Sequence, residues 1–160
     1  MTDQPTNDIL DELDQTILKE LQVDGRISNA ELASRIKLSP PATHARLKRL
    51  EQRGYIRQYA ALLDRERIGY DMLCFVHISL QLHQPEQVEG IRVAINQMPE
   101  VIECYHVTGE FDYLLKVVVR NRKDLERFII QQLTPIRGIA RIYTSLVLNE
   151  VKATTVLPVT

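Results

Sequence analysis

The segment from Met72 to Leu82 alternates between two sets of side chains, and this alternation restricts the possible folds more than any other feature of the sequence. Side chains at every second position of a β-strand point to the same face of a sheet. One set is Met72, Cys74, Val76, Ile78, Leu80 and Leu82, and the other is Leu73, Phe75, His77, Ser79 and Gln81. The pattern predicts a long strand with one face in a hydrophobic core and the other half exposed.

The rest of the C-terminal part switches between helical and strand-like spacing of its apolar residues. Pro99 ends the first helical stripe, and Gly109-Glu110 forms a short junction between two strands. The order βαββαβ is typical of a ferredoxin-like α+β fold. The predicted elements are a strand at 72–82, a helix at 86–98, strands at 101–108 and 111–119, a helix at 124–133 and a strand at 139–148.

Two helices cover only one face of such a sheet, so the other face, with Phe75 and His77, needs a cover from elsewhere. A second copy of the chain is the economical cover, which predicts a homodimer. We also expect an apolar edge at Tyr113, Leu115 and Val117 to need covering by this assembly.

Three helices are predicted in the N-terminal part. Apolar residues recur at helical spacing from Leu10 to Val23, and Gly25 ends this first helix. The sequence Ser28-Asn29-Ala30-Glu31 fits a capping box that starts a short second helix. Ser39 can cap a third helix, from Pro40 to Arg53, and prolines are accepted in the first turn of that helix. Two short helices joined by a tight turn form a helix-turn-helix.

The segment at 55–63 is expected to be extended and to lead the chain away from these helices. We therefore place the domain boundary between residues 62 and 63.

The charges of the chain are distributed in blocks. Residues 1–24 carry seven acids and one base, residues 25–57 two acids and eight bases, and residues 58–160 twelve acids and eleven bases. A basic block gains affinity for a duplex by releasing phosphate counterions, although a solvated basic face would show the same composition. The coincidence of the basic block with the helix-turn-helix favours binding of double-stranded DNA over a three-helix interaction module.

The third helix is expected to enter the major groove, with its early residues at base edges and its later cations on phosphates. Thr43, Leu47 and Leu50 face the core. The candidate DNA-binding residues are Ser39, Pro41, Ala42, His44, Ala45, Arg46, Lys48, Arg49, Arg53 and Arg57.

Other functional classes find little support in the sequence. Cys74 and Cys104 form no C-x-x-C pair, so they suggest reduced core thiols and neither a disulfide nor a zinc site. No run of apolar residues reaches membrane-spanning length and the N-terminus is acidic, so we expect a cytoplasmic protein without a membrane partner. His106, Glu110 and Asp112 could exchange protons, but no nucleophile, phosphate loop or metal spacing accompanies them, so we expect neither an enzyme nor a metal or other cofactor.

The whole chain resembles the Lrp/AsnC (leucine-responsive/asparagine-type, feast-famine) family of transcription regulators. The segments that carry the resemblance are Leu38-Ser39-Pro40, Arg46-Leu47-Lys48-Arg49-Leu50-Glu51, Gly54-Tyr55-Ile56, Val107-Thr108-Gly109-Glu110-Phe111-Asp112-Tyr113-Leu114-Leu115 and Leu148-Asn149-Glu150-Val151-Lys152. The resemblance implies regulation of transcription at promoter DNA, and a homodimer that assembles into larger rings, commonly octamers. It also implies an amino-acid effector bound between dimers, near residues 108–113. A free-standing effector-binding or assembly module is the remaining alternative, which the helix-turn-helix disfavours.

Within this expected effector site, Gly109 can take a positive φ and expose N–H groups to a carboxylate, and Asp112 could receive an ammonium group. From the residues alone, a tight hairpin that needs Gly109, with Asp112 as its cap, is the favoured explanation of the pattern. Ile142 stands where many family members have a polar residue, so we expect an apolar effector such as leucine or methionine. The effector-binding candidates are Tyr105, Val107, Thr108, Gly109, Glu110, Asp112, Tyr113, Ile142 and Thr144.

Overall fold

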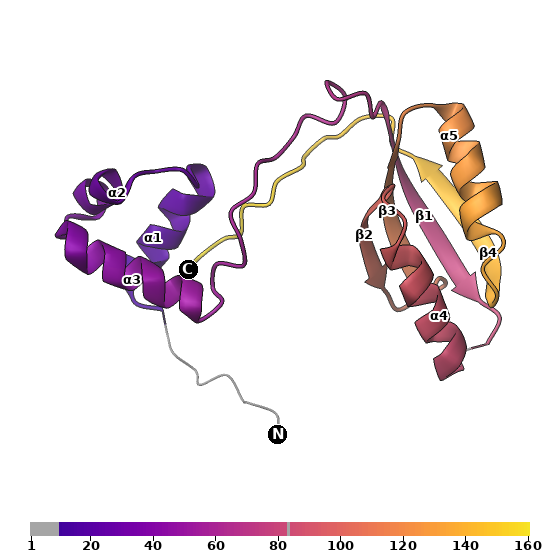
Figure 1. Cartoon of the computed structure of the whole chain (residues 1–160), viewed down its shortest axis with the longest axis horizontal. Coiled ribbons are helices and arrows are strands. Elements are labelled where there is room, and N and C mark those ends of the chain that lie inside the picture. The colour runs from indigo at the N-terminus through magenta and orange to yellow at the C-terminus, as the bar shows by residue number, and fades with distance from the viewer. Residues whose placement is uncertain (1–9, 83) are drawn as a thin grey trace. The chain divides into compact units, whose positions relative to one another are not determined.

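The computed structural model describes residues 10–82 and 84–160 of the chain, drawn in Figure 1. Two compact units are present. The first extends to Leu62 and also includes the C-terminal segment Ala153–Thr160, and the second is Leu63–Lys152. The C-terminal segment is therefore part of the same unit as the N-terminal helices, although the sequence gives no reason to separate it from the second unit.

The first unit contains the helices α1 (Glu12–Val23), α2 (Asn29–Ile36) and α3 (Pro40–Gln52). Each helix begins at a residue whose side chain accepts a hydrogen bond from the backbone two or three residues later. These residues are Asp11, Ser28 and Ser39, of which Ser28 and Ser39 were predicted from the sequence. The core between the helices contains Ile17, Leu32, Ile36 and Leu50.

A tight turn connects α2 to α3. Lys37 adopts the left-handed conformation with φ of 57°, and its N–H donates to the carbonyl oxygens of Ala33 and Ser34. The backbone therefore reverses within Lys37 and Leu38 before Ser39 caps α3. This geometry fixes the angle at which α3 leaves the other two helices, as the helix-turn-helix prediction requires.

The second unit is a four-stranded antiparallel sheet with the order β2-β3-β1-β4. In chain order its elements are β1 (Met72–Leu80), α4 (Pro85–Asn96), β2 (Val101–His106), β3 (Tyr113–Val119), α5 (Arg122–Arg127) and β4 (Ile139–Leu146). This order and topology confirm the predicted α+β arrangement. Each predicted strand is two residues shorter in the structure, at one of its ends.

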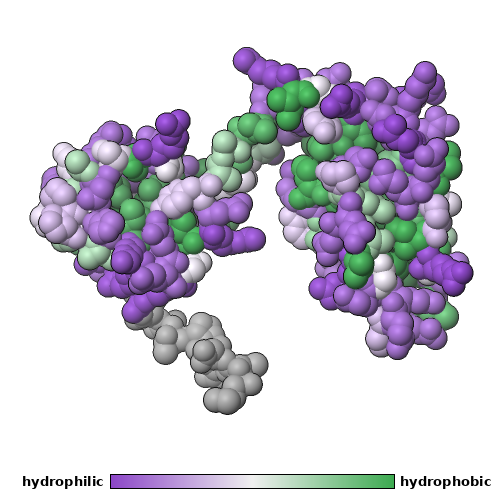
Figure 2. Space-filling view, viewed as in Figure 1, coloured by the Kyte–Doolittle hydropathy of each residue, from purple (hydrophilic) through white to green (hydrophobic). Residues whose placement is uncertain are grey.

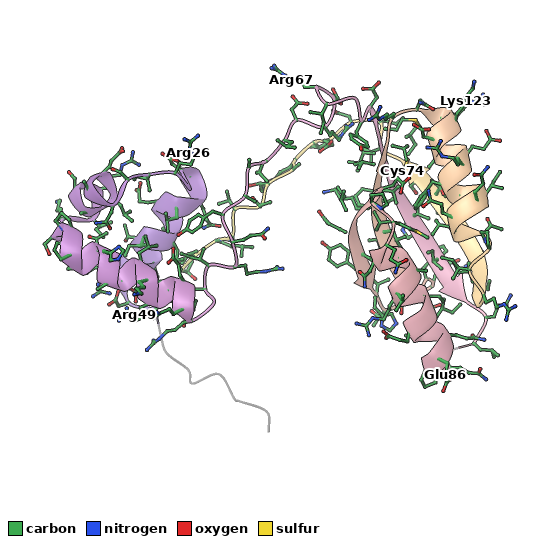
Figure 3. All side chains as sticks on the ribbon, viewed as in Figure 1. Arg26, Arg49, Arg67, Cys74, Glu86 and Lys123 are labelled. Atoms are coloured by element: carbon green, nitrogen blue, oxygen red, sulfur yellow. The ribbon has the colours of Figure 1, made fainter. Side chains whose placement is uncertain are left out.

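The two faces of the sheet differ as the alternation predicts. Cys74, Val76 and Ile78 are fully buried, and Cys74 is labelled in Figure 3. They pack with Ile91 of α4 and with Phe128, just after α5, so both helices lie on this face. Phe75 and His77 lie on the opposite, open face and are only partly buried by their own chain.

One expectation about the faces is wrong. Tyr113, Leu115 and Val117 were expected to form an apolar edge that an assembly covers, but they are at most 3% exposed. They pair in register with Ile78, Val76 and Cys74 and therefore lie under the helices. Leu114, which pairs with His77, occupies the open face in their place.

Two further segments differ from the sequence prediction. The expected helix at 124–133 is α-helical only to Arg127 and continues as a π-helical turn, Phe128–Leu133, closed by Thr134, whose N–H donates to the carbonyl of Ile129 at 2.9 Å. Residues 57–64 are extended but pair with no strand of the sheet. Figure 2 shows apolar surface on the extended segments before β1 and after β4. Exposed apolar residues of these segments are Leu62, Leu63, Leu148 and Val151.

The C-terminal segment is fastened to α1 by one side chain. The Gln22 amide nitrogen donates to the Leu157 carbonyl at 3.1 Å, and the Leu157 N–H donates to the Gln22 Oε1 at 2.6 Å. This paired contact joins the chain end to the N-terminal helices within one unit. Among the described residues, no helix is both long and apolar enough to cross a membrane.

Candidate DNA interface and effector site

The outer surface of α3 presents most of the predicted DNA-binding residues. Thr43 and Leu50 are buried and Leu47 is half-buried, as predicted. The opposite side is free of core contacts, and its exposed residues are Ser39, Pro41, Ala42, His44, Ala45 and Lys48. The structure therefore brings the candidates for base contact together on one helical surface. Arg53 and Arg57, just after the helix, are also exposed.

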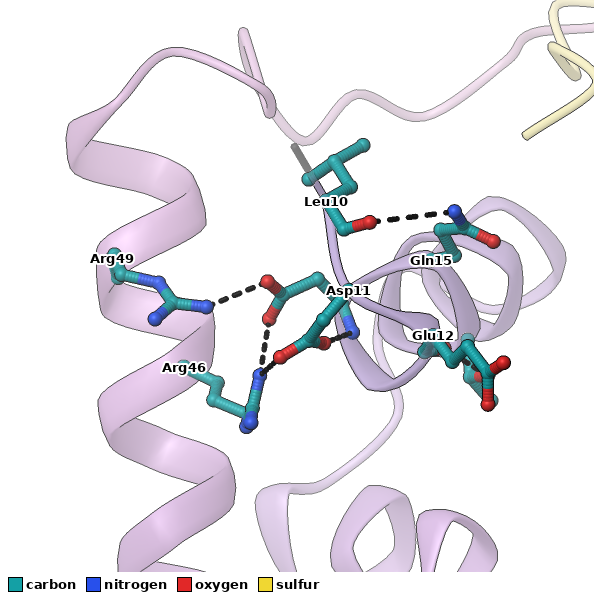
Figure 4. Close-up of polar contacts among 8 residues, drawn as sticks. Leu10, Asp11, Glu12, Gln15, Arg46 and Arg49 are labelled. Atoms are coloured by element: carbon teal, nitrogen blue, oxygen red, sulfur yellow. Dashed lines mark hydrogen bonds and ion pairs between the residues drawn. The ribbon is translucent and has the colours of Figure 1, made fainter. Parts of the chain in front are cut away.

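Arg46 and Arg49 are held by α1. Arg46 Nη1 lies 2.6 Å from Asp11 Oδ2 and 2.8 Å from Asp14 Oδ1 (Figure 4). Arg49 Nη2 lies 2.6 Å from Asp14 Oδ2. The side chain of Asp14 is only 5% exposed, so this carboxylate is a buried charge with two cationic partners. The ion pairs join α1 to α3 and give both arginines a role within the unit.

Asp11 and Asp14 were not among the candidate residues predicted from the sequence. Asp14, however, lies four residues after Leu10 and three before Ile17, which is a core position of the helical stripe. A carboxylate at such a position signals a buried partner. The Asp11 carboxylate accepts a hydrogen bond from the Asp14 N–H and another from the Arg46 guanidinium, and these hold the pKa of Asp11 below its usual value.

The predicted effector loop folds over the end of β1. Gly109 has a φ of 121°, which confirms the conformational freedom expected of it. The Val107 N–H donates to the Asp112 carbonyl, and the Asp112 N–H to the Ile78 carbonyl, both at 2.9 Å. Asp112 Oδ2 also accepts from the Leu80 N–H at 2.7 Å. Asp112 therefore fixes the hairpin to β1, which is the structural role that the sequence left open.

A cluster of rings that the sequence analysis did not identify lies beside this loop. His77 is 4.9 Å from Phe111 and 5.7 Å from Tyr143, measured between ring centroids. Arg141 covers the Phe111 ring at 4.9 Å and binds the Glu110 carboxylate at 2.8 Å. The Glu110 carboxylate thus already has a cationic partner within the chain. We call His77, Phe111 and Tyr143 the open-face ring cluster.

The nine effector candidates do not form one site within a single chain. Tyr105 is on β2 and Ile142 and Thr144 are on β4, the two outer strands of the sheet. The pairing registers also place Tyr105 on the open face but Ile142 and Thr144 on the helix-covered face. Ile142 packs against the core of its own unit, which explains its apolar character without a ligand. The loop residues Val107 to Asp112 and the adjoining Tyr113 remain together.

The two units match two family models. Residues 10–57 match a winged helix-turn-helix DNA-binding domain, and residues 73–157 match the Lrp/AsnC ligand binding domain. A DNA-reading unit joined to a ligand-binding unit defines a class, the ligand-responsive regulators of transcription. The chain belongs to the Lrp/AsnC family of these regulators. Because this family consists of regulators and not enzymes, proton transfer by His106, Glu110 and Asp112 is set aside.

The relatives resemble the chain over nearly its whole length. The leucine-responsive regulatory protein of Escherichia coli is 40% identical over 143 residues, which are 89% of this chain and 87% of that protein. A transcriptional regulator of Neisseria meningitidis, solved in complex with L-methionine, has a TM-score of 0.90 at 37% identity and covers 94% of this chain and 97% of its own. The feast or famine regulatory protein of Mycobacterium tuberculosis, also complexed with L-methionine, has a TM-score of 0.85 at 31% identity, with 95% and 100% covered.

Proposed function

We propose that this regulator binds an apolar amino acid such as leucine or methionine, and that binding changes its oligomeric state or its affinity for promoter DNA. The observation that carries the proposal is the ligand-binding domain at 73–157, shared with two relatives solved with L-methionine. The Glu110 carboxylate is paired with Arg141, so it offers no ready partner to a basic effector side chain. Residues up to Leu62 would read DNA, and the unit that follows would sense the effector and assemble the oligomer.

DNA binding of the purified protein to its own promoter fragment tests this function directly. We expect fluorescence anisotropy to report salt-dependent binding whose midpoint, or stoichiometry, changes when leucine or methionine is added. Lysine and aspartate are the matched controls, because their side chains would bury a charge without a partner. An unchanged titration with all four amino acids would contradict the proposed effector class.

Within the effector site, Gly109 and its neighbours would hold the α-carboxylate through backbone N–H groups, and Asp112 would hold the α-ammonium. The structure suggests a sharper substitution than removal of the Asp112 side chain. Asp112→Asn keeps an oxygen for the Leu80 N–H and removes only the negative charge. We expect leucine and methionine to bind about tenfold or more weakly to this variant by calorimetry, because an ammonium loses its counter-charge.

A matched measurement separates charge from folding in that experiment. The melting temperature of Asp112→Asn should stay near that of the wild type, whereas Asp112→Ala should lower it, because the Leu80 N–H loses its acceptor. Undiminished leucine or methionine binding by Asp112→Asn would refute the ammonium assignment.

The exposed surface of α3 is proposed to lie in the major groove. Pro41, Ala42, His44 and Ala45 would contact base edges and Ser39 the backbone. The cations Lys48, Arg53 and Arg57 would contact phosphates. Arg46 and Arg49 would also contact phosphates, but their ion pairs with α1 restrict how far their side chains can reach.

Lys48 provides the clean test of a phosphate contact, because it is exposed and holds no described carboxylate. Lys48→Ala should weaken binding to specific and random duplexes alike and lower the salt slope by about one, while the melting temperature is unchanged. Arg46→Ala should weaken DNA binding and also lower the melting temperature, since Asp11 and Asp14 lose a partner. If Lys48→Ala weakened binding only to the specific duplex, the phosphate assignment would be wrong.

The open face is proposed to be covered by the same face of a second copy, which forms the homodimer from which a larger ring, commonly an octamer in this family, assembles. The row Tyr105, Leu114, His77 and Tyr143 crosses this face from one edge of the sheet to the other. Tyr105 and Tyr143 at the ends of the row are more than half exposed in the single chain. Two such rows facing each other would bury the rings and the leucine together.

A further inference from the structure

A cavity of about 340 Å³ lies between α4 and the edge strand β2, on the helix-covered side of the sheet. It is lined by Val88, Arg92, Ile95 and Asn96 of α4 and by Cys104, His106 and Tyr113 from the strands. Its volume is at the lower end of the roughly 300–1,000 Å³ that small-molecule sites occupy. Residues 107–112 of the predicted effector loop do not line the cavity, and Tyr113 is the one effector candidate that does.

Tyr113 points to a ligand in this cavity. The residue is only 3% exposed, and yet its side chain lines the cavity wall. Its hydroxyl takes part in none of the hydrogen bonds formed among the described residues. Burial raises the pKa of Tyr113, so the phenol stays protonated and can donate. The ring stacks on His106 at 4.9 Å with an interplanar angle of 23°, which fixes its direction. The hydroxyl is not among the fully buried polar atoms that lack a partner, so it is open to the cavity, where water or a bound molecule can accept from it.

The charges at the cavity favour an anion. Arg92 is the cation of the lining, and no aspartate or glutamate is part of it. Arg92 contacts Glu89 only at 3.4 Å, and both side chains are more than 60% exposed. The ion pair is therefore weak, and a bound anion can take the place of Glu89 beside Arg92. An ammonium group would meet Arg92 in the lining, and the nearest carboxylate, Glu89, lies outside the lining and is paired with Arg92. A free amino acid therefore fits this cavity poorly.

We propose that the cavity binds a small apolar carboxylate without an amino group, of the branched 2-oxo acid class, as a second ligand of this regulator. The carboxylate would pair with Arg92, and the 2-oxo group would accept from the Tyr113 hydroxyl and the Asn96 amide. The branched alkyl group would lie on Val88 and Ile95. The site does not depend on the amino-acid site at residues 107–112.

Titration calorimetry of the full-length protein with 4-methyl-2-oxopentanoate tests the proposal. We expect saturable binding by the wild type and about tenfold or weaker binding by Arg92→Gln, which removes the anchoring charge. Tyr113→Phe, which removes only the hydroxyl, should weaken binding by about threefold to tenfold. Arg127→Gln is the matched control, because Arg127 is also an exposed arginine paired with an acid three residues earlier, and it should bind as the wild type does.

Three results would overturn the proposal: no saturable binding at millimolar 4-methyl-2-oxopentanoate, wild-type binding by Arg92→Gln, or competition by leucine that depends on Arg92. Asp112→Asn separates this site from the proposed amino-acid site, because it should weaken leucine binding and leave the oxo acid unaffected. Loss of oxo-acid binding by a folded Asp112→Asn would also contradict the proposal. Failure of leucine binding by the wild type would count only against the proposed function.

Discussion

Replacing Leu114 by aspartate is expected to convert the protein from a dimer or larger assembly into a monomer. Leu114 is on β3, one of the two central strands, and on the open face it lies between Tyr105 of β2 and His77 of β1. In the proposed dimer this position is buried between two sheets, where an unpaired carboxylate costs several kcal/mol per copy. Because a two-fold interface contains the substitution twice, the dissociation constant should rise by about three orders of magnitude or more. Light scattering coupled to size-exclusion chromatography at micromolar concentration measures the change.

The matched control is Ile130→Asp, which places the same charge on an apolar residue of the π-helical turn. Ile130 is 57% exposed and lies outside the sheet, so this variant should remain at least a dimer. A Leu114→Asp protein that kept its native mass in solution would show that another surface holds the copies together. Circular dichroism of both variants should match the wild type, because Leu114 is only partly buried in the single chain.

Replacing Asp14 by alanine is expected to lower the stability of the N-terminal unit by about 2–3 kcal/mol. The substitution removes a carboxylate that contacts both Arg46 and Arg49, and it leaves two neighbouring cations and a gap beside α1. The side chains of Arg46 and Arg49 are 26% and 42% exposed, so water recovers part of the loss and the effect is below that of a fully buried pair. For a unit of this size, the melting temperature should fall by about 10 °C or more.

Glu12→Ala is the control for that experiment, since Glu12 is an exposed acid in the same first turn of α1. It should cost well under about 1 kcal/mol, the range of a dipole interaction at the surface. Thermal unfolding followed by circular dichroism, together with DNA affinity at a temperature where both variants are folded, provides the comparison. Equal melting temperatures for the two variants would mean that the ion pairs add nothing to the stability of the unit.

The helices and strands were predictable from the sequence because their signals are local. Ser28 and Ser39 cap helices through their own side chains, and the alternation at 72–82 separates the two faces of one strand. The open face at Phe75 followed from the same argument. The assignment failed at Tyr113, Leu115 and Val117, because the face to which a strand turns its side chains depends on its register with β1, and register is not visible in one strand alone.

The sites depend on contacts between distant segments, and the sequence showed them only in part. The loop around Gly109 was found through the conformation that a glycine permits. Asp14 was missed, because the partner of a buried carboxylate lies 32 residues away on another helix. Tyr105 and Ile142 were grouped by family resemblance, whereas the strand order places them at opposite edges of the sheet.

The contact between Leu157 and Gln22 can form only late in the synthesis of the protein. The two residues are 135 positions apart, and the entire second unit lies between them in the sequence. A ribosome releases the chain from its N-terminus, so the three helices can form long before Leu157 emerges, but their contact with the chain end cannot. Folding of the second unit first draws its own ends, Arg65 and Glu150, together at 2.9 Å, which shortens the loop that remains to be closed. The N-terminal unit can therefore begin to fold first, but its contact with the chain end can form only after the second unit has been synthesised.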